Sequence, residues 1–166
     1  IRIGYRIGEG QAVEARSTAA IAIFSSLLLA IFGALLIYLF RDPMIQLYTE
    51  ENNVVQLARQ LLMFVVFFLI FDATQSTAIG TLRGYKDTQV PMKIALVSYW
   101  VIGLPLGCTL GFGWLAPPLE VYGFWIGLAA GVGCASILLC YRLFRLSGDP
   151  ALIRSLSATA DPEPGL

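Results

Sequence analysis

Residues 61–82 read LLMFVVFFLIFDATQSTAIGTL, a run of 22 residues in which Asp72 is the single charged side chain. A helix needs about 20 predominantly apolar residues to cross the hydrocarbon core of a bilayer, which is roughly 30 Å thick. The run therefore predicts a membrane-spanning helix. Because an acid at the centre of such a helix costs about 2.5–3.5 kcal/mol on insertion scales, we expect Asp72 to face protein or a water-filled cavity.

Three uncharged runs of similar length predict three more spans, at residues 19–40, 94–116 and 121–141. The composition agrees, because 57% of the residues are hydrophobic and 13% are charged, whereas soluble domains have about 25% charged residues. The eleven basic and eleven acidic residues balance, so no net charge attracts nucleic acid. The expected fold class is an all-α, polytopic membrane protein with four transmembrane helices.

Basic residues concentrate on one side of the predicted spans. Nine of the eleven Arg and Lys residues lie before the first span, between residues 83 and 93, or after the fourth span. The positive-inside rule then places these segments, and the C-terminus, in the cytoplasm. The expected organisation is a cytoplasmic loop at 1–18, a four-helix membrane part at 19–146 and a disordered cytoplasmic tail at 147–166.

Enzymatic and metal chemistry have little support in the sequence. There is no histidine, and the cysteines Cys108, Cys134 and Cys140 stand inside apolar runs without a CxxC pair. These residues cannot assemble a nucleophile with a histidine base or a typical zinc site. We expect no enzyme, no catalytic residue, no bound metal and no cofactor.

Polar residues follow Asp72 along one face of its helix. Helical spacing places Gln75 and Ser76 one turn after the acid. One interpretation is that Asp72 binds a proton or a monovalent cation, with Gln75 and nearby carbonyl groups completing a Na⁺ shell. The alternative is a structural acid that pairs with an Arg, or hydrogen-bonds to helices, outside this segment.

Glycines recur at every fourth position in the third and fourth spans: Gly103, Gly107 and Gly111, then Gly123, Gly127 and Gly131. This spacing puts each trio on one helix face, where a neighbouring backbone can approach closely. Both helices are therefore expected to pack against a partner through these faces. Pro105, between two of the glycines, predicts a kink in the third span.

Several blocks of the sequence match a known family in their order and spacing. They are RIGYRIGEG at 2–10, DATQ at 72–75, LRGYKDT at 82–88, YWVIGLPLG at 99–107 and GFWIG at 123–127. Together they resemble the C-terminal part of multidrug and toxic compound extrusion (MATE) transporters, in particular the NorM-like bacterial branch.

The resemblance implies more than the composition does. The four spans would be helices nine to twelve of a twelve-helix antiporter of the bacterial inner membrane, which exports cationic or amphipathic drugs in exchange for Na⁺ or H⁺. Asp72 occupies the place of a cation-binding acid in the tenth helix of the family. Some relatives carry a tyrosine where this chain has Phe68. Phe68 has no hydroxyl that could serve as a ligand for the ion, and the choice between Na⁺ and H⁺ stays open.

The implied partners are the lipid bilayer, small-molecule drugs and an N-terminal lobe that this sequence does not contain. A hypothesis from another class is a non-transporting four-helix scaffold or accessory subunit, which would use its glycine faces to bind partner helices. That hypothesis explains the glycines but gives Asp72 no role.

Overall fold

The structure is a computed structural model that describes residues 2–9, 11–114, 117–149, 151–153 and 155–156. The described chain is helical and contains no strand. Its elements are α1 (Arg2–Gly8), α2 (Ala12–Gln46), α3 (Asn52–Gly84), α4 (Gln89–Val97), the π-helix η1 (Ser98–Gly103), α5 (Leu104–Gly111) and α6 (Glu120–Ser147). Four stretches are long and apolar enough to cross a membrane, with α4, η1 and α5 forming one of them. The predicted all-α class and its four spans are confirmed.

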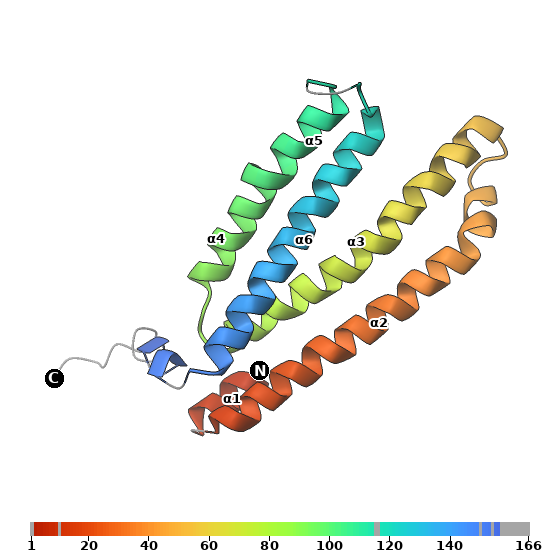
Figure 1. Ribbon diagram of the computed structural model, residues 1–166. Helices are drawn as coiled ribbons and strands as arrows, with labels where there is room; N and C mark the ends of the chain where they lie inside the picture. Colours follow the sequence, from red (N-terminus) through yellow and green to blue (C-terminus); the bar gives the residue numbers. More distant parts are fainter. Residues whose placement is uncertain (1, 10, 115–116, 150, 154, 157–166) are drawn as a thin grey trace.

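The four rods run alternately up and down and form a splayed layer in the order α2, α3, α6 and the α4–η1–α5 rod (Figure 1). The start of α2 and the ends of α3 and α6 meet beside α1, and we call this the closed end. The α2–α3 and α5–α6 connections lie at the opposite, open end, where α3 and α6 have diverged. The position of a side chain along this layer therefore decides how closely it is packed.

The helices extend beyond the apolar runs that predicted them. The first span runs from Val13 to Gln46 instead of 19–40, and the second from Asn52 to Gly84 instead of 61–82. At 1.5 Å per residue a 33-residue helix is about 50 Å long, so its ends project past the hydrocarbon core. Glu, Ala and Arg before residue 19 are good helix formers, which explains why much of the expected loop at 1–18 is helical.

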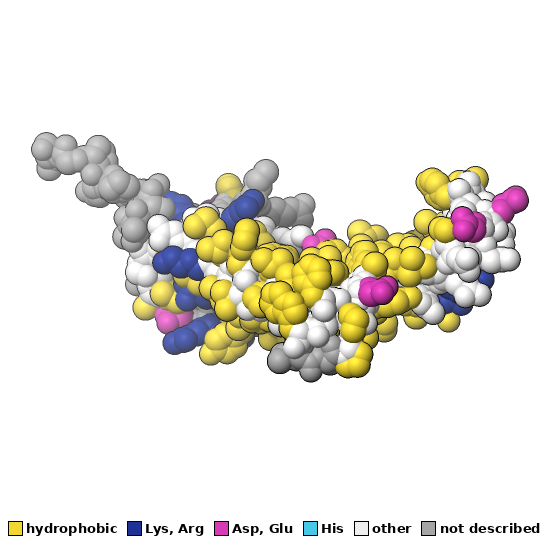
Figure 2. Space-filling view, turned by 90° about the horizontal axis from the view of Figure 1, so that it is seen from above, with side chains coloured by type: hydrophobic (Ala, Val, Ile, Leu, Met, Phe, Trp, Pro, Cys, Tyr) yellow, Lys and Arg dark blue, Asp and Glu magenta, His cyan; other side chains and the backbone are white. Residues whose placement is uncertain are grey.

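The buried core lies at the closed end and joins α1, α2, α3 and α6. Its buried members are Ile3, Ala15, Ala19, Ala78, Leu82, Tyr85, Ala135, Leu139, Leu143, Leu146 and Ile153. Long apolar side chains over the rest of the spans are largely exposed, and Figure 2 shows them as a nearly continuous yellow surface. Such a surface suits contact with lipid or with other membrane helices.

The predicted disordered tail at 147–166 is described only in part. Residues 151–153 are helical, and Ile153 is buried in the closed-end core. The tail prediction did not include this contact, because it followed the Ser, Asp and Pro content of the whole segment and passed over the short apolar group Leu152, Ile153 and Leu156, which packs on the core. Residues 150, 154 and 157–166 lie outside the described residues, so the expectation of disorder there stays a prediction.

The glycine faces pack against each other. A Cβ added at Gly127 would lie 2.4 Å from the backbone of Gly107, and one at Gly123 would lie 2.3 Å from the nitrogen of Gly111. Only glycine permits this approach of the α4–η1–α5 rod to α6. The predicted glycine packing is confirmed, and its partner is within the chain.

The helix changes its geometry just before Pro105, where sequence analysis expected a kink. Residues 98–103 form the π-helix η1, and α5 begins at Leu104 with the proline in its first turn. Proline has no N–H, and its ring clashes with the carbonyl four residues earlier, here that of Val101. A π-helical turn accommodates this clash by widening the backbone.

The connection after α3 is held by a buried ion pair. The Nε atom of Arg142 on α6 donates to a carboxylate oxygen of Asp87 at 2.8 Å, and Asp87 is only 2% exposed. The connection turns at Lys86, whose φ of 62° is left-handed, while the Asp87 N–H bonds the Leu82 carbonyl. This pattern ends a helix by satisfying its last carbonyls.

Burial raises the pKa of the neighbouring Tyr85 phenol, and the positive charge of Arg16 lowers it by a smaller amount. Tyr85 is 0% exposed, and its hydroxyl has no hydrogen-bond partner among the described residues. The phenol is therefore neutral over the physiological pH range. Its contribution at the closed end is the volume of its ring.

Replacing Gly127 by Ala should separate α6 from the α4–η1–α5 rod. The added Cβ meets backbone rather than a flexible side chain, so we expect a loss of about 1–3 kcal/mol in the free energy of unfolding. The control is Gly80→Ala on α3, where a Cβ would meet nothing within 4 Å. Denaturant unfolding in lipid nanodiscs measures both, and equal stability of the two variants would contradict close packing.

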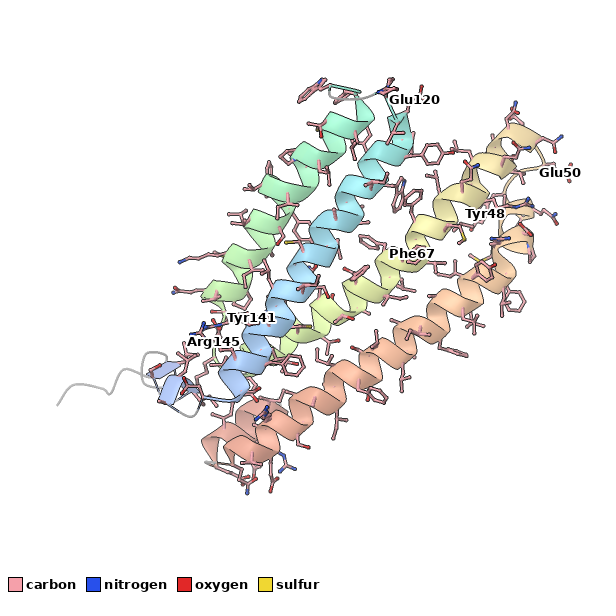
Figure 3. The ribbon with its side chains drawn as sticks, viewed as in Figure 1. Tyr48, Glu50, Phe67, Glu120, Tyr141 and Arg145 are labelled. Carbon is pink, nitrogen blue, oxygen red and sulfur yellow. The ribbon has the colours of Figure 1, made fainter. Side chains whose placement is uncertain are left out.

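Replacing Arg142 by Ala leaves the Asp87 carboxylate buried without its cation. We expect a loss of about 3 kcal/mol in the free energy of unfolding, measured in the same way. Arg145→Ala is the matched control, because Arg145 is exposed on the same helix (Figure 3). Adding Asp87→Asn to the Arg142→Ala variant should recover part of the loss; no recovery would show that the orphaned charge is not its cause.

Candidate functional site

Asp72 lies on α3 just beyond the closed-end core. The buried residues of α3 are Gln75, Ala78, Thr81 and Leu82, all of which lie between Asp72 and the closed end. No described residue of α3 on the other side of the acid is buried. Asp72 itself is half-buried. The acid therefore stands at the level where the tight packing of α3 stops.

The neighbours of α3 define the side on which Asp72 points. A Cβ added at Gly33 of α2 would lie 3.5 Å from Leu69, and one added at Gly133 of α6 would lie 4.0 Å from Phe71. Each residue of an α-helix is rotated by about 100° from the one before it. Asp72 therefore points between the directions of Leu69 and Phe71, on one of the two broad faces of the layer. Phe68 and Gln75 fall within the same sector. The spacing and the observed contacts agree that the three predicted site residues share a side of α3.

Asp72 has no hydrogen bond or ion pair with the part of the chain that the structure describes. Other acids do have cationic partners: Glu14 pairs with Arg6, Asp42 with Arg59 and Asp87 with Arg142. The arginines of these pairs thus lie at the two ends of the layer, away from Asp72. A carboxylate at mid-span without a partner is costly, which makes Asp72 the strongest candidate for a functional residue.

Gln75 has a partner that spacing did not reveal. Its Nε2 donates to the hydroxyl oxygen of Tyr99 at 2.7 Å, and that hydroxyl lies 3.0 Å from Oε1, to which it donates. Gln75 is 6% exposed. Both polar atoms of the amide thus face η1, so a cation that binds Oε1 would compete with the hydroxyl of Tyr99 for this oxygen. The predicted support of Asp72 by Gln75 and Phe68 stays a prediction.

Threonines on the opposite side of α3 serve their own helix. The hydroxyl of Thr74 donates to the carbonyl of Ile70, and that of Thr81 to the carbonyl of Thr77, each at 2.8 Å. Threonine in a helix often forms this bond to the carbonyl four residues earlier. Their hydroxyls are therefore satisfied without a ligand.

An apolar pocket of about 420 Å³ lies between α6 and the rod that contains η1. Its lining residues are Tyr99, Trp100, Gly103, Leu104, Gly107, Phe124 and Leu128. Glycines and aromatic residues both belong to this lining. Asp72 is not among the lining residues, but Tyr99 belongs to both the pocket and the hydrogen bond with Gln75.

A second tyrosine–glutamine pair bridges α6 and α3 nearer the open end. The Tyr122 hydroxyl donates to Oε1 of Gln60, and its ring lies 6.2 Å from that of Phe64. Neither bridge was predictable from the sequence, because the partners are 62 and 24 residues apart. Helical periodicity reports neighbours on one helix and carries no signal for such pairs.

Comparison with known proteins identifies the family. The family model described as MatE matches residues 1–109. Multidrug resistance protein MdtK of Cronobacter sakazakii is 38% identical over 91% of this chain and 33% of its own length. Multidrug resistance protein NorM of Vibrio cholerae is 42% identical over 88% of this chain and 32% of its own length. Multidrug resistance protein PmpM of Pseudomonas aeruginosa is 39% identical over 87% of this chain and 31% of its own length.

The chain thus spans about a third of the length of the curated relatives that it matches. These relatives are named as multidrug resistance proteins, and none of the three names is that of an enzyme. The matched region contains α1 to α4, η1 and most of α5, including Asp72. The family model covers more than half of the chain, and the chain therefore belongs to the MatE family.

Proposed function

We propose that this chain is part of a multidrug efflux antiporter of the bacterial inner membrane, which exports cationic or amphipathic compounds in exchange for Na⁺ or H⁺. The single observation that carries the proposal is Asp72, a half-buried carboxylate at mid-span with no partner in the described chain. The multidrug resistance proteins among its relatives support the export activity.

A coupling ion acts by changing the charge of the site. Either H⁺ or Na⁺ neutralises the Asp72 carboxylate and removes the cost of a bare charge within the membrane. A ligand shifts a conformational equilibrium only if it binds one state better than the other. Asp72 lies one turn before the buried residues of α3, at the limit of its close packing, so its occupancy would favour one arrangement of α3 against its neighbours over another.

The distribution of charge supports a cytoplasmic closed end. Most dark-blue basic side chains in Figure 2 gather over that end, while magenta acids mark the α2–α3 connection at the other. The positive-inside rule then gives the cytoplasmic C-terminus predicted from the sequence. The four spans would be helices nine to twelve of the transporter, with 19–146 as their membrane part.

Transport requires more than these four helices. Transporters that alternate access move one bundle against another around a shared site, and the relatives are about three times as long as this chain. An N-terminal lobe of the same transporter is therefore the proposed partner. The drugs would be bound where the two lobes face each other.

The scaffold alternative has lost its main support. That hypothesis uses the glycine faces to bind partner helices. In the structure Gly107 of the α4–η1–α5 rod and Gly127 of α6 already contact each other. It also leaves the unpaired Asp72 unexplained. Efflux coupled to a cation accounts for the acid.

Replacing Asp72 by Asn should abolish drug export driven by a cation gradient in the native transporter that contains this chain. The amide keeps the size of the carboxylate but cannot bind a proton or neutralise Na⁺, so we expect at least a roughly hundredfold loss of driven export. Proteoliposomes loaded with a fluorescent cationic drug, with an imposed Na⁺ or pH gradient, provide the measurement.

The control variant is Glu120→Gln, which removes an exposed acid at the open-end start of α6 (Figure 3). This variant should export at the wild-type rate. Full gradient dependence in the Asp72→Asn variant would rule out Asp72 as the coupling residue.

A further inference from the structure

Two tyrosine–glutamine pairs connect α3 to the neighbouring hairpin, and they differ in position. Gln60–Tyr122 is exposed and lies near the open end. Gln75–Tyr99 is part-buried and includes the residue one helical turn from Asp72. The second pair is thus placed to sense what happens at the acid, whereas Gln60 of the first pair lies 12 residues from Asp72 along α3, about 18 Å.

Tyr99 stands on an irregular element. It belongs to η1, the π-helix that precedes Pro105, and π-helical turns are frequent at functional sites. The adjacent Ser98 is 0% exposed, and its hydroxyl has no hydrogen-bond partner among the described residues. A buried hydroxyl without a partner therefore lies next to Tyr99, in a segment where π-helical geometry replaces the regular helix.

The ring of Tyr99 also has space beside it. It forms a wall of the 420 Å³ pocket together with Trp100. If the hydroxyl lost its bond to Gln75, the apolar space of this pocket would be open to the ring. The hydroxyl bond is thus the polar restraint on a side chain that has room to move.

We infer that Gln75 and Tyr99 form a switch that links the cation site to η1 and its pocket. A cation on Asp72 draws the Oε1 atom of Gln75 into its shell, Gln75 releases the Tyr99 hydroxyl, and the ring of Tyr99 moves toward the pocket. Tyr99 is a positioning residue that acts through Gln75. This inference rests on the proposed function, because it requires Asp72 to bind the coupling ion.

Trp100 provides the reporter. Trp114→Phe and Trp125→Phe, with phenylalanine at the tryptophans elsewhere in the native transporter, leave Trp100 as its one source of tryptophan fluorescence. Na⁺ is then added, or the pH lowered, and the emission spectrum is recorded in nanodiscs, while bound cation is measured in parallel. We expect an emission shift that saturates with cation binding.

Tyr99→Phe removes the hydroxyl and keeps the ring. It should still bind the cation but lose the emission shift, because no bond remains to be broken. Gln75→Leu removes the same pair from α3 and should also lose the shift; it serves if the first variant does not fold, and it is compared with wild type at equal bound cation because Gln75 belongs to the proposed cation shell. The matched control is Tyr122→Phe, which breaks the other bridge and should keep the full shift.

The outcomes separate the two proposals. An unchanged emission shift in Tyr99→Phe, with cation binding intact, would overturn the switch and leave the cation site standing. Cation binding that is absent in the wild type, or unaffected by Asp72→Asn, would overturn the proposed function and the switch with it. Loss of the shift in Tyr122→Phe as well would show a general loosening of α3 and would contradict a specific switch.

Discussion

The close packing of α3 against α6 at the closed end fixes where every other feature of the molecule lies. Ala78 and Leu82 of α3, with Ala135 and Leu139 of α6, are all 0% exposed and belong to one buried cluster. Small side chains let the two helices approach, and packing rather than a hydrophobic driving force holds helices together in lipid. Past this contact the helices diverge (Figure 1). Asp72 comes directly after it, which is why the acid is neither sealed in the core nor fully exposed.

The glycine contact gives the other half of the layer a different character. The α4–η1–α5 rod and α6 touch backbone to backbone at Gly107 and Gly127, so they form a stiff hairpin. The contact between this hairpin and α3 varies along its length. It is densely packed at the closed end, and toward the open end it consists of the hydrogen-bonded pairs Gln75–Tyr99 and Gln60–Tyr122. A conformational change that follows cation binding would therefore act between α3 and the hairpin more readily than within the hairpin.

The spans, Asp72 and the glycine contact could be predicted because each follows from a local pattern in the sequence. Hydropathy over about 20 residues marks a span, and a charge inside a span stands out against its surroundings. The ends of the helices were not predictable from hydropathy, since Ala, Glu and Arg continue a helix without being apolar. Gln75 appeared as a free ligand because its partner, Tyr99, lies on another helix. The ion pair of Asp87 with Arg142 was hidden for the same reason, since 55 residues separate them.

The central claim is that Asp72 binds the coupling ion, and counting bound cations tests it most directly. Purified wild-type transporter and its Asp72→Asn variant are moved from cation-free alkaline buffer to buffer that contains Na⁺ or more protons. Uptake of radioactive Na⁺ and of protons is then measured for each protein. The account predicts that the variant takes up one cation fewer per molecule than the wild type. Equal uptake by the two proteins would contradict it.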